Sequence, residues 1–367
     1  MRTLQVDLGE RSYPIYIGGG LLAETGEYFE RHNLAKKSPL LIVTDEHVGP
    51  LYLSKLETSL QNSGYRTISK VVKAGEKSKS LEVFEEIMTT AIEGGLDRHS
   101  VVIALGGGVV GDLAGFVAAS YMRGVKFVQI PTTILAHDSS VGGKVAVNHR
   151  LAKNMIGAFH QPEMVLYDVD TLQTLPERDV RSGLSEMIKH GLIWDKSFTD
   201  WCRDQSDKLL DLDPESLVYG LTLGCSIKAQ VVSTDEREHG LRAILNLGHT
   251  LGHALEATGG YGQFLHGEAI SIGMVAAAKI AVNRGRDQSI YLVTKDLFER
   301  FGLPTTIPSQ MNEDDIIAAM MHDKKFKENQ IIYVLPISIG EVEIVNDVTA
   351  DDVRHVIQEL KEEGQHV

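Results

Sequence analysis

The stretch VVIALGGGVVGDLAG, residues 101–115, decides the fold because it joins three features. Residues 101–105 form a short, continuous apolar run, which is typical of a buried strand in a parallel sheet. Gly106, Gly108 and Gly111 follow at G-x-G-x-x-G spacing, which lets backbone N–H groups approach a pyrophosphate at the start of the next helix. A glycine-rich turn that binds nothing is the alternative. The strand before and the apolar segment after the glycines favour phosphate binding.

Strands and helices alternate on both sides of this stretch. Residues 40–43 and 127–130 are further short apolar runs typical of buried strands. A helix is expected to begin after Ser80 and to end at Gly94, with apolar residues at helical spacing. Residues 6–17 alternate like a hairpin. This order of elements predicts an α/β domain with a parallel sheet.

The pattern changes near residue 175. Thr174 and Glu177 fit a capping box, and the chain beyond them is mostly helical in pattern. A small hairpin and a closing helix are expected within 331–360. We therefore predict an N-terminal dinucleotide-binding domain, residues 1–175, and a mainly α-helical C-terminal domain, residues 176–367.

The C-terminal part carries histidines at the spacing of metal ligands. In the stretch NLGHTLGH, His249 and His253 are four residues apart and share one face of a helix. His266 begins a second apolar segment that could pack beside that helix. This pattern predicts a metal site, which makes the C-terminal domain metal-binding. The alternative is a pair of core histidines whose ring nitrogens are satisfied by hydrogen bonds.

The charge distribution restricts the partners. The chain of 367 residues has a net charge of −14, which argues against a nucleic-acid partner because binding a phosphate backbone needs a broad basic face. Several basic residues nevertheless fall among the glycine and histidine motifs, and together they predict a local pocket for a small anion. They are Arg123, Lys144, Lys153, Lys189, Lys228, Arg242, Lys324 and Lys325.

The sequence also indicates a compartment. The start of the chain has no apolar signal-peptide core, and the longest nearly apolar run, residues 269–282, is too short to span a bilayer and contains Lys279. We therefore expect neither export nor a membrane partner. Cys202 and Cys225 are expected to remain reduced thiols. Together these features predict a cytoplasmic protein.

The acidic residue that would bind the ribose of a dinucleotide is not in its usual place. The strand after the glycine loop runs into Pro131 and does not end in Asp or Glu. Asp45 ends the earlier strand and is the better candidate. A dinucleotide would then lie across the strand ends, with its adenosine near Asp45 and its pyrophosphate at residues 107–112.

Several motifs occur together in a fixed order. They are the segments 106–112, 131–133, 138–144, 153–159, 185–189 and 246–249. In this combination the chain resembles the 3-dehydroquinate synthase family from about Asp45 to Lys325. The resemblance implies an N-terminal NAD-binding α/β domain and a C-terminal helical domain that carries the metal.

The resemblance also implies a set of site residues. The metal ligands would be Glu186, His249 and His266, with His253 close to the metal or the substrate. Two imidazoles and a carboxylate with open positions suit a catalytic Zn²⁺, with Co²⁺ possible, although this reasoning does not choose between His253 and His266. The implied NAD⁺ contacts are Asp45, Gly75, Glu76, Lys79, Gly108, Val109, Val110, Gly111, Asp112, Thr132, Thr133, Asp138, Lys144, Lys153, Thr171 and Thr174. The implied substrate contacts are Arg123, Lys144, Asn154, Lys189, Lys228, Arg242, Asn246, His253 and one of Lys324 or Lys325.

The family's reaction converts 3-deoxy-D-arabino-heptulosonate 7-phosphate to 3-dehydroquinate and phosphate, a step of the shikimate pathway toward aromatic amino acids. NAD⁺ oxidises the C5 hydroxyl, phosphate is eliminated, the ketone is reduced back, and the ring closes by an intramolecular aldol step. The resemblance thus implies a phosphorus–oxygen lyase that uses NAD⁺ catalytically. It also implies a homodimer, because in the family the arginine matching Arg123 comes from the partner subunit.

Three other functions compete with this interpretation. Related cyclases act on other sugar phosphates, but a substrate without a carboxylate gives no reason for Arg242, which this chain keeps together with Asn246. An NAD-dependent metal alcohol or glycerol dehydrogenase would release NADH and would not need the anion-binding set. A protein that only binds a dinucleotide would leave the proposed metal ligands unexplained.

Overall fold

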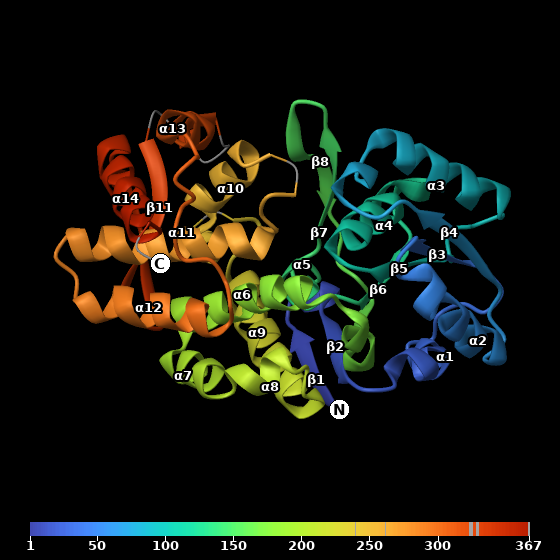
Figure 1. Cartoon of the computed structure of the whole chain (residues 1–367). Coiled ribbons are helices and arrows are strands. Elements are labelled where there is room, and N and C mark those ends of the chain that lie inside the picture. Colours follow the sequence, from blue (N-terminus) through green and yellow to red (C-terminus); the bar gives the residue numbers. More distant parts are fainter. Residues whose placement is uncertain (239, 261, 323–325, 328–329, 366–367) are drawn as a thin grey trace. The chain divides into compact units, whose positions relative to one another are not determined.

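The computed structural model describes residues 1–238, 240–260, 262–322, 326–327 and 330–365 (Figure 1). Contacts divide the chain into two compact units: the first holds residues 1–175 and 214–233, and the second holds residues 176–213 and 234–367. The predicted contacts Lys324 and Lys325 lie outside the described residues. The division into domains 1–175 and 176–367 stays a prediction.

The first unit is built on a seven-stranded sheet in the order β1-β2-β9-β6-β5-β3-β4. β1 pairs with β2 antiparallel, and the remaining neighbours pair in parallel. The parallel sheet predicted from the sequence is therefore confirmed. The strands are β1 Arg2–Val6, β2 Tyr13–Gly18, β3 Leu40–Asp45, β4 Thr67–Val72, β5 Val101–Gly106, β6 Lys126–Pro131 and β9 Met164–Asp168.

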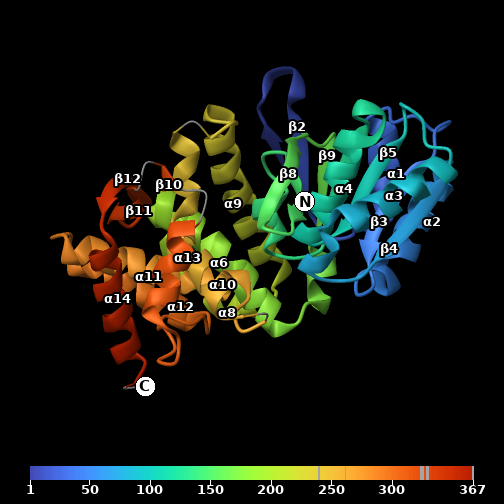
Figure 2. The ribbon, with the colours of Figure 1, turned by 90° about the horizontal axis from the view of Figure 1, so that it is seen from above.

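Helices cover both faces of this sheet (Figures 1 and 2). α1 Leu21–Arg31 and α2 Ser54–Asn62 pack on one face, while α3 Leu81–Glu93 and α4 Gly108–Ser120 pack on the other. Side chains of β3 and β5 alternate between these two cores, so both faces of each strand are buried. That is why these strands read as continuous apolar runs.

Shorter elements complete the first unit. A hairpin of β7 Lys144–His149 and β8 Ala152–Phe159, which the sequence did not predict, forms a separate two-stranded sheet. An ideal Cβ on Gly115 of α4 would lie 2.3 Å from the Val145 side chain, so only a glycine lets α4 approach this hairpin so closely. The other elements are η1 Gly9–Arg11, η2 Gly49–Leu53, η3 Glu76–Ser78, η4 Tyr121–Arg123, α5 Ala136–Ser139, η5 Val169–Thr174 and α9 Pro214–Thr234.

The second unit is mainly helical, as predicted. α11 His266–Asn283 is buried along most of its length and packs against α6, α10, α12, α14 and β11. The predicted hairpin is present, with β11 and β12 antiparallel in a small sheet. The elements are α6 Glu177–Trp194, α7 Lys196–Asp204, α8 Ser206–Leu210, η6 Leu241–Asn246, α10 His249–Thr258, α12 Gln288–Arg300, α13 Glu313–His322, β10 Phe326–Lys327, β11 Gln330–Ser338, β12 Glu341–Val348 and α14 Ala350–Glu363.

The predicted capping box at Thr174 is wrong. α6 begins at Glu177 after Pro176, and no side chain caps it. Leu175 is extended, with ψ of 140°, because the ring of the following proline disfavours the helical region for the residue before it. The Thr174 hydroxyl instead contacts the hydroxyl of Tyr52 at 2.7 Å.

The expected apolar face of α3 is also only partly buried. The structure buries Ile87 and Ala91, whereas Leu81 and Ile92 at the two ends of the helix are exposed.

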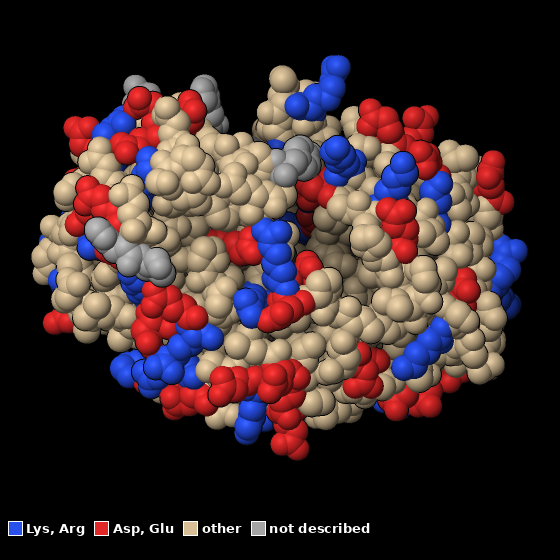
Figure 3. Space-filling model, in the orientation of Figure 1, with Lys and Arg blue, Asp and Glu red and all other residues tan. Residues whose placement is uncertain are grey.

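Among the described residues, no helix combines the length and apolar character needed to cross a membrane. On the face drawn in Figure 3, acidic and basic side chains are interspersed.

Candidate active site

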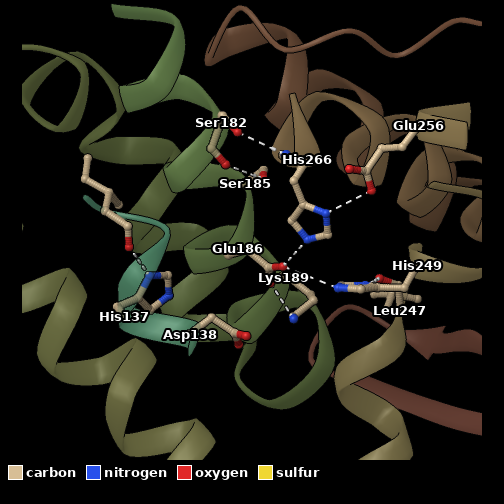
Figure 4. A network of polar contacts seen from close by, with 12 residues as sticks. His137, Asp138, Ser182, Ser185, Glu186, Lys189, Leu247, His249, Glu256 and His266 are labelled. Atoms are coloured by element: carbon tan, nitrogen blue, oxygen red, sulfur yellow. Dashed lines mark hydrogen bonds and ion pairs between the residues drawn. The ribbon is translucent and has the colours of Figure 1, made fainter. Parts of the chain in front are cut away.

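Three side chains of metal-ligand type meet in the second unit. Glu186 comes from α6, His249 begins α10 and His266 begins α11. Oε1 of Glu186 lies 3.3 Å from Nε2 of His249 and 3.2 Å from Nε2 of His266. One ligand atom from each residue lies within 4.8 Å of the others. The cluster in Figure 4 can therefore present two imidazole nitrogens and a carboxylate to one cation.

Glycines allow the helices that carry these side chains to approach closely. An ideal Cβ on Gly267 would lie 1.9 Å from the carbonyl oxygen of Ser182 in α6. An ideal Cβ on Gly273 would lie 1.9 Å from the carbonyl oxygen of Gly248, the residue before α10. Any side chain at either position would push α11 away. The backbone of α11 thus touches the backbones that carry the other two residues of the cluster.

Hydrogen bonds from the far side of each imidazole aim the rings. Nδ1 of His249 lies 3.0 Å from the carbonyl oxygen of Leu247, and Nδ1 of His266 lies 3.1 Å from Oε2 of Glu256. Both Nε2 atoms are thereby turned toward the carboxylate of Glu186. Sequence reasoning missed Glu256, because only packing brings it beside His266.

The cluster combines opposite charges under burial. Lys189 forms an ion pair with Glu186, and the two side chains are only 1% and 2% exposed. Burial, followed by the Lys189 ammonium, lowers the pKa of His249 to about 3. Burial acts in the same direction on His266, but hydrogen bonds to Glu186 and Glu256 outweigh it and raise its pKa to about 10. A cation that binds here would displace a proton from His266, so the donor set fits a divalent metal.

His253 stands next to this cluster. Its ring centroid lies 5.4 Å from that of His249 and 5.9 Å from that of His266. Together with Glu256 and His266 it forms a second group whose ligand atoms lie within 4.8 Å of one another. The described residues therefore offer two candidate triads that share His266, and the triad with Glu186 is the more deeply buried.

Two of the predicted substrate contacts, Arg242 and Asn246, lie in η6. Arg242 is 3% exposed. Its Nη1 donates to the carbonyl oxygen of Glu236 at 2.5 Å, and its backbone N–H donates to Asp235 at 3.1 Å. Nδ2 of Asn246 lies 3.5 Å from Glu238. A buried guanidinium fixed in this way is suited to an anionic partner.

In the first unit the glycine loop lies where the strand order reverses. β3 leads to β4 on one side of the sheet, whereas β5 lies on the other side of β3 and leads to β6. Ligands of open α/β sheets bind at the carboxyl ends of strands at such a point. The hydroxyl oxygens of Thr44, Thr132 and Thr133 are buried near these strand ends, and none has a hydrogen-bond partner among the described residues. This favours a polar ligand at the edge.

The glycine loop leads directly into α4, with Gly107 as the N-cap residue. An ideal Cβ on Gly107 would lie 3.0 Å from Thr133, and one on Gly108 would lie 3.1 Å from Ser139. Asp45 ends β3, and its Oδ1 accepts backbone hydrogen bonds from His47 and Val48 at 2.8 and 3.0 Å. Its role as a ribose contact stays a prediction.

Lys79 connects two of the other predicted site residues. Nζ of Lys79, whose side chain is 5% exposed, lies 2.6 Å from Oδ2 of Asp112 in α4 and 2.5 Å from Oδ1 of Asn154 in β8. Asn148 adds a hydrogen bond of 2.7 Å to Glu76. The glycine-loop helix, the η3 turn and the β7–β8 hairpin are thus joined by one buried ammonium.

The remaining predicted residues of the first unit have defined places. Lys228 of α9 forms an ion pair of 2.7 Å with Asp138, so a predicted substrate contact and a predicted cofactor contact meet. Tyr52 donates to the carbonyl oxygen of Thr171. Four more lie in loops or on the hairpin: Gly75 before η3, Arg123 at the end of η4 with φ of 70°, Lys144 at the start of β7 and Lys153 in β8.

Comparisons with known proteins agree with this architecture. The model of the 3-dehydroquinate synthase N-terminal region matches residues 69–182, and that of the C-terminal region matches residues 183–326. A 3-dehydroquinate synthase of Desulforamulus reducens is 52% identical over 367 residues, which cover 98% of this chain and 100% of that protein.

Solved structures of sugar phosphate cyclases have the same fold. A 2-deoxy-scyllo-inosose synthase complexed with carbaglucose-6-phosphate, NAD⁺ and Co²⁺ superposes with a TM-score of 0.89 at 27% identity, covering 98% of this chain and 99% of that one. A 2-epi-5-epi-valiolone synthase from Streptomyces hygroscopicus subsp. jinggangensis, with NAD⁺ and Zn²⁺ bound, superposes with a TM-score of 0.87 at 29% identity, covering 97% and 99%. The chain belongs to the 3-dehydroquinate synthase family.

Proposed function

We propose that this protein is a 3-dehydroquinate synthase that converts 3-deoxy-D-arabino-heptulosonate 7-phosphate to 3-dehydroquinate and phosphate. The observation that carries this proposal is the convergence of Glu186, His249 and His266 in a chain of this family. Full-length identity of 52% to a 3-dehydroquinate synthase supports the choice of reaction.

In this proposal Glu186, His249 and His266 hold the metal, Zn²⁺ or Co²⁺. The metal supplies Lewis-acid polarisation of the substrate hydroxyls and lowers the pKa of the one that is oxidised. NAD⁺, held along the strand ends of the first unit, supplies a reversible hydride acceptor. Lys189 neutralises part of the charge of Glu186. His253, whose ring lies beside those of His249 and His266, is proposed to relay the proton of the oxidised hydroxyl.

The substrate's two anionic ends require different donors. Arg242, with Lys228, is proposed to bind the carboxylate, because a guanidinium pairs with it bidentately. The phosphate is proposed to meet Lys144, Asn154 and a side chain of Lys324 or Lys325, together with Arg123 of a second subunit. The proposal therefore includes a homodimer, because Arg123 comes from a second subunit. It also places the enzyme in the cytoplasm. The phosphate leaving group itself can serve as the elimination base.

Phosphate release tests the proposal directly. Purified protein is stripped with a chelator and given the heptulosonate phosphate, with NAD⁺ and Zn²⁺ added singly and together, while absorbance reports NADH. Phosphate release that requires both additions, without net NADH, is the expected result. NADH that accumulates as substrate disappears would favour a dehydrogenase. If neither signal appears, other sugar phosphates become the candidates.

Substrate choice is tested at Arg242. Arg242→Met is expected to raise the KM for the heptulosonate phosphate by tenfold or more, on the order of the contribution of a charged hydrogen bond. Arg237→Met is the matched control, because Arg237 lies in the segment just before η6 and is exposed. An equal KM for both variants would contradict carboxylate binding by Arg242.

A further inference from the structure

Glu256 lies behind the candidate metal centre and belongs to none of the predicted contacts. It is near the end of α10, seven residues after His249, and its side chain is 18% exposed. Its Oε2 atom lies 3.1 Å from Nδ1 of His266, whose Nε2 atom points to Glu186 at 3.2 Å. Figure 4 shows the imidazole of His266 between the two carboxylates.

This arrangement fixes the protonation of the ring. A carboxylate can only accept, so Nδ1 of His266 donates its proton to Glu256, and Nε2, which faces Glu186, is the nitrogen that gives up its proton when a cation binds. His249 has the same arrangement with a weaker acceptor, because its Nδ1 lies 3.0 Å from the carbonyl oxygen of Leu247. The two imidazoles therefore differ: His266 is backed by a negative charge, and His249 by a neutral carbonyl.

The hydrogen bond between His266 and Glu256 also affects which of the two triads can bind a metal. His253, Glu256 and His266 form a second group of ligand type. A metal bound between Glu256 and Nδ1 of His266 would have to compete with the hydrogen bond that joins them. A proton held between Nδ1 and Oε2 occupies both atoms at once. The metal is then directed to the side of the ring that faces Glu186 and His249.

We propose that Glu256 is a positioning residue that holds His266 in the tautomer and orientation required by the metal and that selects the Glu186 triad over the His253 triad. This inference rests on the proposed metal role of Glu186, His249 and His266. It adds a residue that acts through His266 and makes no contact of its own with the metal.

The experiment measures metal affinity of the full-length apo protein, by competition between the protein and a chromophoric chelator for Zn²⁺ and for Co²⁺. Glu256→Ala is expected to weaken binding by about 10- to 100-fold, the usual effect of removing a carboxylate that supports a ligating histidine. Glu256→Gln is expected to lose less, because its amide oxygen still accepts from Nδ1. Affinity within twofold of wild type for both variants would overturn the proposal.

Glu268→Gln is the matched control. Glu268 belongs to the first turn of α11 and accepts from the backbone N–H of Leu265, so its loss perturbs the same helix start without touching the imidazole of His266. Its metal affinity is expected to remain within a few-fold of wild type. A loss as large as that of Glu256→Ala would show that any disturbance of the helix start has the effect, and would overturn the proposal.

A spectroscopic measurement separates positioning from ligation. With ¹⁵N-labelled histidine in the Zn²⁺-saturated proteins, the Nδ1–H of His266 is expected to stay protected from exchange with solvent in wild type and Glu256→Gln, and to exchange rapidly in Glu256→Ala. Equal protection in Glu256→Ala would overturn the proposal.

Two further variants identify the triad that binds the metal. His253→Asn is expected to bind nearly as tightly as wild type, whereas Glu186→Gln is expected to bind far more weakly. The reverse order would make Glu256 a ligand of the second triad and overturn both the inference and the proposed centre. If Glu186→Gln bound metal weakly, as expected, but Glu256→Ala kept the affinity of wild type, the inference alone would be overturned and the proposed metal centre would stand.

Discussion

Replacing Lys79 by methionine should loosen the β7–β8 hairpin of the first unit. Lys79 is 5% exposed and its ammonium is shared by Asp112, which is 21% exposed, and by Asn154. Methionine keeps the length of the side chain but leaves the carboxylate without its cation. Removing one partner of a buried ion pair costs about 3–5 kcal/mol, and the partial exposure of Asp112 lowers our expectation to about 2–3 kcal/mol.

Hydrogen exchange of residues 144–159 is the appropriate assay. Both tryptophans, Trp194 and Trp201, lie in the second unit, so fluorescence would report on the wrong part of the chain. A decrease of about 2–3 kcal/mol in the free energy of local opening corresponds to roughly 30- to 150-fold faster exchange of the hairpin amides.

Lys70→Met is the matched control for this experiment. Lys70 also pairs with a carboxylate of the first unit, at 3.0 Å from Glu86, but the two side chains are 27% and 60% exposed. An exposed pair of this kind contributes about 1 kcal/mol or less. If Lys79→Met changed hairpin exchange no more than Lys70→Met does, the buried ammonium would not hold the hairpin. Asp112→Asn in the Lys79→Met background should recover part of the loss, because it removes the unpaired buried charge.

Three further outcomes follow from the geometry. Gly267→Ala should weaken Zn²⁺ binding and destabilise the second unit by about 1–3 kcal/mol, as seen in chemical unfolding, because its Cβ would meet a backbone oxygen of α6 at 1.9 Å. Burial alone would raise the pKa of Glu363, but the ion pair with Lys295 outweighs it and lowers the pKa below the unfolded value of 4.5. The stabilisation by Glu363 is therefore complete above pH 4.5 and is lost as the pH falls below it. The free energy of unfolding of Glu363→Gln, followed by tryptophan fluorescence, should therefore decrease less steeply with falling pH than that of wild type. Burial raises the pKa of both Cys202 and Cys225, the latter to about 12, so a thiol reagent should label neither in the native protein and both after denaturation.

Local patterns in the sequence predicted β3, β5 and β6 of the first unit's sheet, together with the β1–β2 hairpin, but did not predict β4 or β9. Runs such as 40–43 and 101–105 are buried on both faces between two layers of helices, and a strand with two buried faces is apolar at every position. The β7–β8 hairpin was missed because its residues do not follow such a rule. In β8 the exposed positions include the apolar residues Met155 and Phe159, whereas Ile156 and Ala158 have an intermediate exposure, so neither apolar alternation nor an apolar run marks the strand.

The capping box failed for a reason that is also local. Thr174 and Glu177 have the required spacing, but Pro176 lies between them and forces Leu175 into the extended region. This preference opposes a helix that begins at Leu175, and the structure begins the helix two residues later, at Glu177. Of two competing local signals, the steric exclusion before proline is the stronger one.

The choice between His253 and His266 depends on contacts between distant segments. His249 and His253 lie on one helix, and their spacing alone made both of them candidates to share a ligand set. Glu186, however, is on α6, and the backbone of α6 is touched by α11 at Gly267, where an ideal Cβ would lie 1.9 Å from the carbonyl oxygen of Ser182. That contact brings the first residue of α11, His266, against Glu186. Gly267, the residue after His266, is therefore as informative as the histidine itself. A side chain at position 267 would push α11 away from α6, and the imidazole of His266 would then move away from the carboxylate of Glu186.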